Sequence, residues 1–141
     1  MPRKWYFLLK EPLTLPPQEQ VAQALQKALE NWRAHGQPIA WKVDFPFPLL
    51  LEITAFSPTT GCSIDKLFRC VKETLSHFQL TLLPSDYVLV LEEGKTFTKK
   101  FYDIVKEYRS RKGGGSWQVV ELGEGGYRVV PLEESYLRVH L

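Results

Sequence analysis

The sequence of 141 residues has little cysteine and no long apolar run. Its 2 cysteines are too few for a disulfide scaffold, which favours a reducing compartment. No stretch approaches the roughly 20 apolar residues that a membrane-spanning helix needs, and the apolar run near the first residue is too short for a signal peptide. We therefore expect no membrane span and a cytoplasmic location.

A strong charge of either sign is also missing. The chain has 18 Lys and Arg residues against 16 Asp and Glu, and the resulting net charge of +2 is too small to indicate nucleic acid or an acidic membrane as a partner. Hydrophobic residues make up 44% and charged residues 24%, close to the average of globular proteins, which argues against general disorder. We predict a single domain over residues 1–141, because a chain of this length can bury one core.

Strand and helix signals alternate over residues 1–91. Aromatic and aliphatic runs predict strands at 5–9, 39–45, 49–56 and 87–91, and apolar residues at three- and four-residue steps predict helices at 17–35 and 64–78. This is the element order of a split βαβ, ferredoxin-like sandwich. We predict an α+β fold whose core, at 1–91, is a ferredoxin-like βαββαβ sandwich.

Residues 92–141 are expected to extend this core by a C-terminal helix and a β-hairpin. Apolar residues between Phe97 and Tyr108 indicate the helix, and the glycines at 113–115 end it. Strand signals at 117–122 and 127–130 flank a Gly-rich turn, which is typical of a hairpin. The last seven residues, from Ser135, are a candidate final strand.

In the predicted topology, three connections meet at one end of the sheet, which we call the pole. They are the end of the first helix, the start of the second helix and the end of the fourth strand. These connections also carry most of the residues whose side chains could bind a ligand or take part in a reaction. The candidate ligand-binding residues are Trp32, Gly61, Cys62, Ser63, Asp65, Lys66 and Lys95.

Cys62 and His35 are the candidate catalytic residues at the pole. Cys62 lies near a predicted helix N-terminus, where amide donors and the helix dipole favour a thiolate. His35 lies in the predicted last turn of the other helix, where the dipole favours an imidazolium. A thiol and an imidazole are the minimum for an activated nucleophile. The alternative is that Cys62 is a small packed side chain and His35 caps its own helix.

An anion site is the second hypothesis for the same helix start. The segment 61–63 offers amides and a hydroxyl to a phosphate or carboxylate, and Lys66 and Lys95 would add positive charge. The alternative is that the Ser63 or Thr60 hydroxyl caps the helix.

Metal, cofactor and nucleic-acid sites have no support in the sequence. Cys62 and Cys70 would lie about 12 Å apart along one helix, too far for a disulfide or a zinc pair. The predicted third strand, 49–56, lacks the basic-Gly-aromatic pattern of RNA-recognition sheets. We therefore expect no metal, no cofactor and no nucleic-acid partner.

The loop residues resemble the pattern of an uncharacterised bacterial family commonly labelled "ABC transporter ATPase". The resemblance is carried by Trp32-x-x-His35-Gly36 and by Gly61-Cys62-Ser63-Ile64-Asp65-Lys66, and extends to Glu93-Gly94 and to Pro131-x-x-x-Ser135-Tyr136, where the pattern has Trp in place of Tyr. The family has no assigned activity, so the resemblance implies neither a reaction nor catalytic residues.

The family's label conflicts with the residues around Lys95. Gly94-Lys95-Thr96 is similar to the end of a phosphate-binding P-loop, but that motif needs a glycine at position 89, where the chain has Leu89. We therefore do not expect a P-loop ATPase.

The function that these observations favour is a non-catalytic module that binds a small anionic ligand or a protein partner at the pole. The alternatives are a thiol-dependent enzyme, with Cys62 as nucleophile and His35 as base or ion-pair partner, and a homodimer formed through the exposed sheet face.

Overall fold

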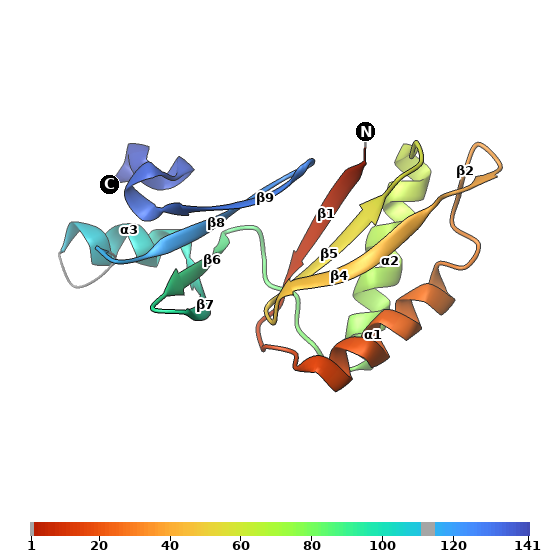
Figure 1. Ribbon diagram of the computed structural model, residues 1–141, viewed down its shortest axis with the longest axis horizontal. Coiled ribbons are helices and arrows are strands. Elements are labelled where there is room, and N and C mark those ends of the chain that lie inside the picture. The colour runs from red at the N-terminus through yellow and green to blue at the C-terminus, as the bar shows by residue number, and fades with distance from the viewer. Residues whose placement is uncertain (1, 111–114) are drawn as a thin grey trace. The chain divides into compact units, whose positions relative to one another are not determined.

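The computed structural model describes residues 2–110 and 115–141. The chain divides into two compact units, Met1–Leu82 and Leu83–Leu141, and each combines helix with antiparallel sheet (Figure 1). The α+β prediction is therefore confirmed. In the two described ranges, no helix has the length and apolar character needed to cross a membrane.

The first unit is a three-stranded antiparallel sheet with two helices against one face (Figure 1). Its elements are β1 (Arg3–Leu8), α1 (Leu15–Ala28), β2 (Arg33–Ala34), β3 (Gln37–Pro38), β4 (Trp41–Phe47), β5 (Leu50–Ala55) and α2 (Gly61–His77). The strand order is β1-β5-β4, and β2 and β3 form a separate two-stranded hairpin. The core lies between the helices and the sheet, where α1 contributes Val21 and Leu25 and α2 contributes Leu67 and Val71.

The alternation of side chains along β1 and β5 decides which face the helices cover. Trp5 pairs with Ile53 in register, and both belong to the core. Tyr6 pairs with Glu52 on the opposite face, where the Tyr6 hydroxyl donates a hydrogen bond of 2.6 Å to the Glu52 carboxylate. Lys4 Nζ lies 3.2 Å from the same carboxylate, and a buried charge needs such partners.

The first helix is shorter than its apolar spacing predicts. It ends at Ala28, and residues 33–38 form the β2–β3 hairpin. The apolar spacing continues to Trp32 because this residue is also buried, although it follows the turn after the helix. His35 and Gly36 form the tip of the hairpin with φ angles of +53° and +76°. Two consecutive positive values are typical of a two-residue turn that matches the twist of its strands.

The predicted fourth strand does not complete the sheet of the first unit. After α2, a single antiparallel bridge joins Leu82 to Leu9, and Pro84 follows in the connection. β6 (Tyr87–Glu92) instead pairs with two strands of the second unit. The prediction of one four-stranded ferredoxin-like core at 1–91 is therefore wrong, and the first unit ends at Leu82 rather than at residue 91. The chain has two compact units where a single domain was predicted.

The second unit is a four-stranded antiparallel sheet of order β7-β6-β8-β9 with a helix and two short 3₁₀ helices. Its further elements are β7 (Lys95–Lys100), α3 (Phe101–Arg109), β8 (Gln118–Gly123), β9 (Gly126–Pro131), η1 (Leu132–Glu134) and η2 (Tyr136–His140). Its core includes Val90, Ile104, Trp117, Leu132 and Leu137.

The predicted hairpin at 117–130 is confirmed as β8 and β9, whereas two other predictions for this unit are wrong. The third helix begins at Phe101, because Glu93 and Gly94 form a tight turn and the following residues pair with β6. The last residues form 3₁₀ turns instead of a strand. Glycines 113 and 114, which were expected to end the helix, lie outside the described residues.

Candidate functional site

A buried hydrogen bond joins two of the loops that the sequence places at the pole. The indole Nε1 of Trp32 donates to the main-chain oxygen of Ser63 at 2.7 Å, and both residues are buried. The chain after α1 and the start of α2 therefore lie side by side, as the sequence predicts. Trp32, a candidate ligand-binding residue, has a structural role because its polar atom is satisfied inside the protein.

Hydrogen bonds hold the chain just after the β2–β3 hairpin against the connection between β5 and α2. The Ser57 hydroxyl accepts a hydrogen bond from the Ala40 amide at 3.0 Å, and the Phe56 amide donates to the Ala40 oxygen at 2.7 Å. The Ile39 amide donates to the Trp32 oxygen at 3.0 Å, which closes the base of the hairpin. The hairpin is thus closed at its base, and the chain that follows it is held to the connection at Ala40.

A cavity of about 180 Å³ opens between these two segments. The residues around it are Ala34, His35, Gln37, Pro38, Ser57 and Pro58. The surface of the cavity is almost entirely carbon, although three of the residues around it have polar side chains. We use the name pole cavity for this feature.

The start of α2 is capped by its own side chains. The Thr60 hydroxyl accepts from the Ser63 amide at 3.1 Å, and the Ser63 hydroxyl accepts from the Thr60 amide at 2.7 Å. This capping box confirms the capping alternative. Ser63 is buried and its hydroxyl is engaged, which corrects its prediction as an anion ligand.

The remaining α2 candidates lie on or near the surface around this cap. Gly61 and Cys62 are exposed in the first turn. Asp65 is exposed beyond the first turn, which contains no acidic residue, and Lys66 is half-buried. These four residues share the helix start that the sequence predicts.

The structure does not join the two candidate catalytic residues. His35 lies at the exposed tip of the hairpin rather than in the last turn of a helix, so the predicted helix dipole is not behind it. In the part of the chain that the structure describes, no hydrogen bond or ion pair links the His35 imidazole to the Cys62 thiol. The expected pair of helix ends with opposite polarity is therefore wrong.

Lys95 belongs to the second unit, as the first residue of β7. The end of the predicted fourth strand therefore does not belong to the pole of the first unit, because this strand, β6, pairs in the sheet of the second unit. Over residues 2–110 and 115–141, no group of three or more His, Cys, Asp or Glu side chains could hold a metal ion.

A cluster of three tryptophans supports the pole and was missed by the sequence analysis. The ring centroids of Trp5 and Trp32 lie 6.3 Å apart, and those of Trp32 and Trp41 lie 6.1 Å apart, both edge to face. Such pairs stabilise beyond the area that they bury. The sequence shows three tryptophans within its first 41 residues, and this does not show that their side chains meet.

Two larger cavities, of about 370 Å³ each, lie beside α3 in the second unit. Lys106 and Ser110 line both. In one of them Lys99 is within 3.0 Å of Glu107, so part of its charge is already paired. Neither cavity is lined by a residue that the sequence predicts to bind a ligand or to be catalytic, and we take the pole cavity as the candidate site.

Scans of this chain against protein-family models, curated proteins and solved structures each found no match.

Proposed function

We propose that the first unit is a non-catalytic binding module, and that its pole cavity receives one apolar side chain of a protein partner. The observation that carries the proposal is the cavity of about 180 Å³ between the β2–β3 hairpin and Ser57-Pro58. The segments on both sides of the cavity are held by hydrogen bonds, because the Ile39 amide donates to the Trp32 oxygen at the base of the hairpin and the Ser57 hydroxyl accepts from the Ala40 amide. Segments that are already ordered lose less conformational freedom on binding.

The size of the cavity favours a side chain over a whole ligand. Pockets for drug-sized molecules and cofactors have volumes of roughly 300–1,000 Å³, whereas the pole cavity has about 180 Å³. A single buried anchor with a polar surround is a common way for a protein interface to gain affinity. His35, Gln37 and Ser57 would form this polar surround.

A small anionic ligand and a thiol-dependent reaction have less support. The anion hypothesis needed the Ser63 hydroxyl, which the helix cap uses. The enzyme hypothesis needed His35 beside Cys62, and in the described ranges no hydrogen bond joins them.

ATP hydrolysis of the P-loop kind is equally unsupported, although the resemblance to the family labelled "ABC transporter ATPase" stays a prediction. A P-loop lysine lies at the start of a helix, after a cradle of main-chain amides. Lys95 follows the tight turn at Glu93-Gly94 and begins strand β7.

A peptide selection tests the proposal. We expect phage-displayed random peptides selected on the protein to share one apolar residue. Filling the cavity with Ala34→Leu should weaken the selected peptides by about tenfold or more, the scale of losing a buried anchor. The matched control is Ala28→Leu, the same change at an exposed position of α1.

Equal affinity for the wild type and the A34L variant, with both proteins folded, would exclude the pole cavity as the site. A second copy of the chain is tested separately by sedimentation. A mass of 16.3 kDa at high concentration would exclude the homodimer.

A further inference from the structure

The last ten residues of the second unit, Leu132–Leu141, form two consecutive 3₁₀ turns that we call the C-terminal strap. Leu132 and Leu137 are buried in the core of this unit, and the His140 ring lies 4.9 Å from Phe101 of α3, centroid to centroid. The strap therefore closes one side of the core without being part of the sheet.

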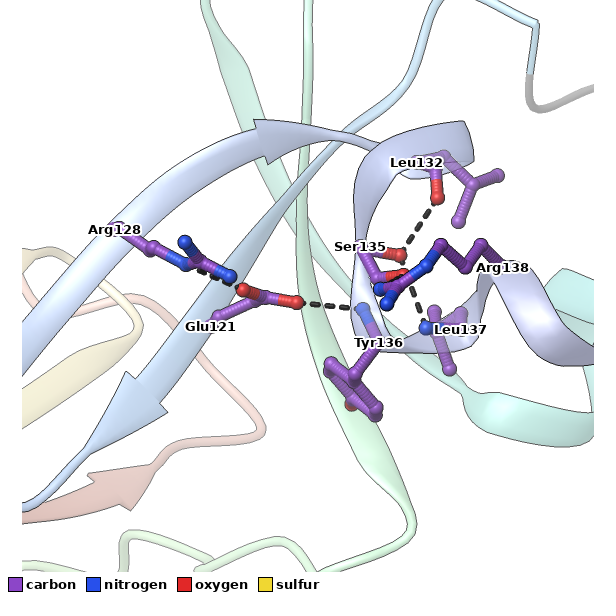
Figure 2. Close-up of polar contacts among 7 residues, drawn as sticks. All are labelled: Glu121, Arg128, Leu132, Ser135, Tyr136, Leu137 and Arg138. Atoms are coloured by element: carbon purple, nitrogen blue, oxygen red, sulfur yellow. Dashed lines mark hydrogen bonds and ion pairs between the residues drawn. The ribbon is translucent and has the colours of Figure 1, made fainter.

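The hydrogen bonds inside the strap are local. Ser135 is fully buried, and its hydroxyl donates to the Leu132 oxygen at 2.6 Å while it accepts from the Leu137 amide at 3.1 Å (Figure 2). The guanidinium of Arg138 donates to the Ser135 oxygen at 3.0 Å. These contacts make the strap coherent within itself, but they do not attach it to the sheet.

One carboxylate on β8 attaches the middle of the strap to the sheet. Glu121 accepts a hydrogen bond of 2.6 Å from the main-chain amide of Tyr136 (Figure 2). Its other oxygen accepts from Nε of Arg128, the residue opposite it on β9, also at 2.6 Å. Arg128 therefore orients the carboxylate toward the strap. Hydrogen bonds to a charged acceptor are about twice as strong as neutral ones.

A second hydrogen bond attaches the start of the strap to the sheet. The Leu132 amide donates to the Trp117 oxygen at 2.9 Å, where β9 has just ended. By contrast, β6 is paired on both of its edges by β7 and β8. A segment with few long-range hydrogen bonds opens at a lower free energy than a strand within a ladder.

We infer that the C-terminal strap opens as a unit about Pro131 while the four-stranded sheet stays folded, and that Glu121 holds it closed. Opening removes Leu132 and Leu137 from the core and uncovers Phe101 and Trp117, which pack in the same cluster. The second unit thus has a closed and an open state, and the Tyr136 amide is the contact through which Glu121 sets the balance between them.

Hydrogen exchange of the full chain tests this inference. In the wild type, the amides of Leu137 and Arg138 should exchange faster than those of Val90 and Val119 in the sheet. Glu121→Gln should speed strap exchange by roughly tenfold, because it removes the charge from both hydrogen bonds, and leave sheet exchange unchanged. The matched control Glu134→Gln removes an exposed charge from the strap itself and should change neither rate.

Equal exchange rates in strap and sheet, or the same acceleration of both by E121Q, would show that the strap opens only with the whole unit and would overturn the inference. An E134Q effect as large as that of E121Q would also overturn it. If E121Q does not fold, Ser135→Ala replaces it. This change removes the internal cap and should accelerate the strap amides alone, whereas an unaltered strap would contradict the inference.

Discussion

The indole of Trp32 donates its hydrogen bond to the main-chain oxygen of Ser63, 31 residues further along the chain. The bond joins the turn after α1 to the first turn of α2, inside the protein rather than on its surface. This contact holds together two loops that are distant in sequence and that both belong to the pole.

We expect Trp32→Phe to lower the free energy of unfolding of the first unit by about 1–3 kcal/mol, because the change removes a buried hydrogen bond and the smaller ring leaves space in the core. Urea denaturation followed by the amide signals of β5 measures this change. The control is Trp41→Phe, because in the described ranges no protein hydrogen bond of the Trp41 indole is recorded. Equal losses in the two variants would show that aromatic packing, and not the hydrogen bond, matters.

Gly36 should be sensitive to a side chain although there is space for one. Its φ angle is +76°, and a Cβ built there meets no atom within 4 Å. Gly36→Ala should therefore cost about 1 kcal/mol through backbone strain alone. Gly61→Ala is the matched control, because Gly61 also has open space but no positive φ, and it should be neutral or slightly stabilising. The same denaturation measurement compares them, and a neutral G36A would contradict the turn geometry.

Glu121 should make the stability of the second unit depend on pH in the acid range. Burial acts to raise the pKa of Glu121, but hydrogen bonds from the Tyr136 amide and Arg128, with the charges of Arg128 and Arg138, outweigh it and lower the pKa. A carboxyl with a lowered pKa in the folded state stabilises above its unfolded pKa, near 4.5, and loses that contribution as the pH falls through the folded pKa.

The measurement for Glu121 is the stability difference between the wild type and Glu121→Gln across pH. We expect the wild type to have the higher free energy of unfolding, by a constant amount near neutral pH and by a decreasing amount below pH 4.5. An advantage that does not change with pH would mean that the charge of Glu121 has no part in it.

The two cysteines should react at different rates in the folded protein. Cys62 is exposed, and Cys70 is half-buried with its sulfur 3.9 Å from the Ala28 oxygen. Iodoacetamide should therefore label Cys62 first, as mass spectrometry of the digest would show. His35→Ala should leave the rate of Cys62 labelling unchanged. A labelling rate that falls with this substitution would restore the thiol-enzyme hypothesis.

The meeting of the two loops at the pole could be predicted from the sequence because it follows from chain direction. β5 runs antiparallel to β4 and ends beside Trp41, just after the hairpin, so the helix that follows begins there, and Thr60 is a recognisable cap for its start. The end of α1 could not be predicted, because the buried Trp32 continues the helical spacing after the helix has ended.

The strands with which β6 pairs could not be predicted either. Its apolar residues suit a central strand of any sheet, and nothing local to 87–92 decides whether its partner is β1 or β7. Strand partners are set by contacts that are distant in sequence, which a single sequence does not display. The pole cavity could not be predicted for the same reason, because its walls come from two segments that are separate in sequence.

Amide NMR mapping of a selected peptide on the full chain decides whether the pole cavity is the binding site. We predict that the shifts concentrate at residues 33–38 and at Ser57, around the pole cavity, and that they vanish when the apolar residue of the peptide is replaced by Ala. Shifts located elsewhere, or shifts that persist with the Ala peptide, would contradict the proposed binding site.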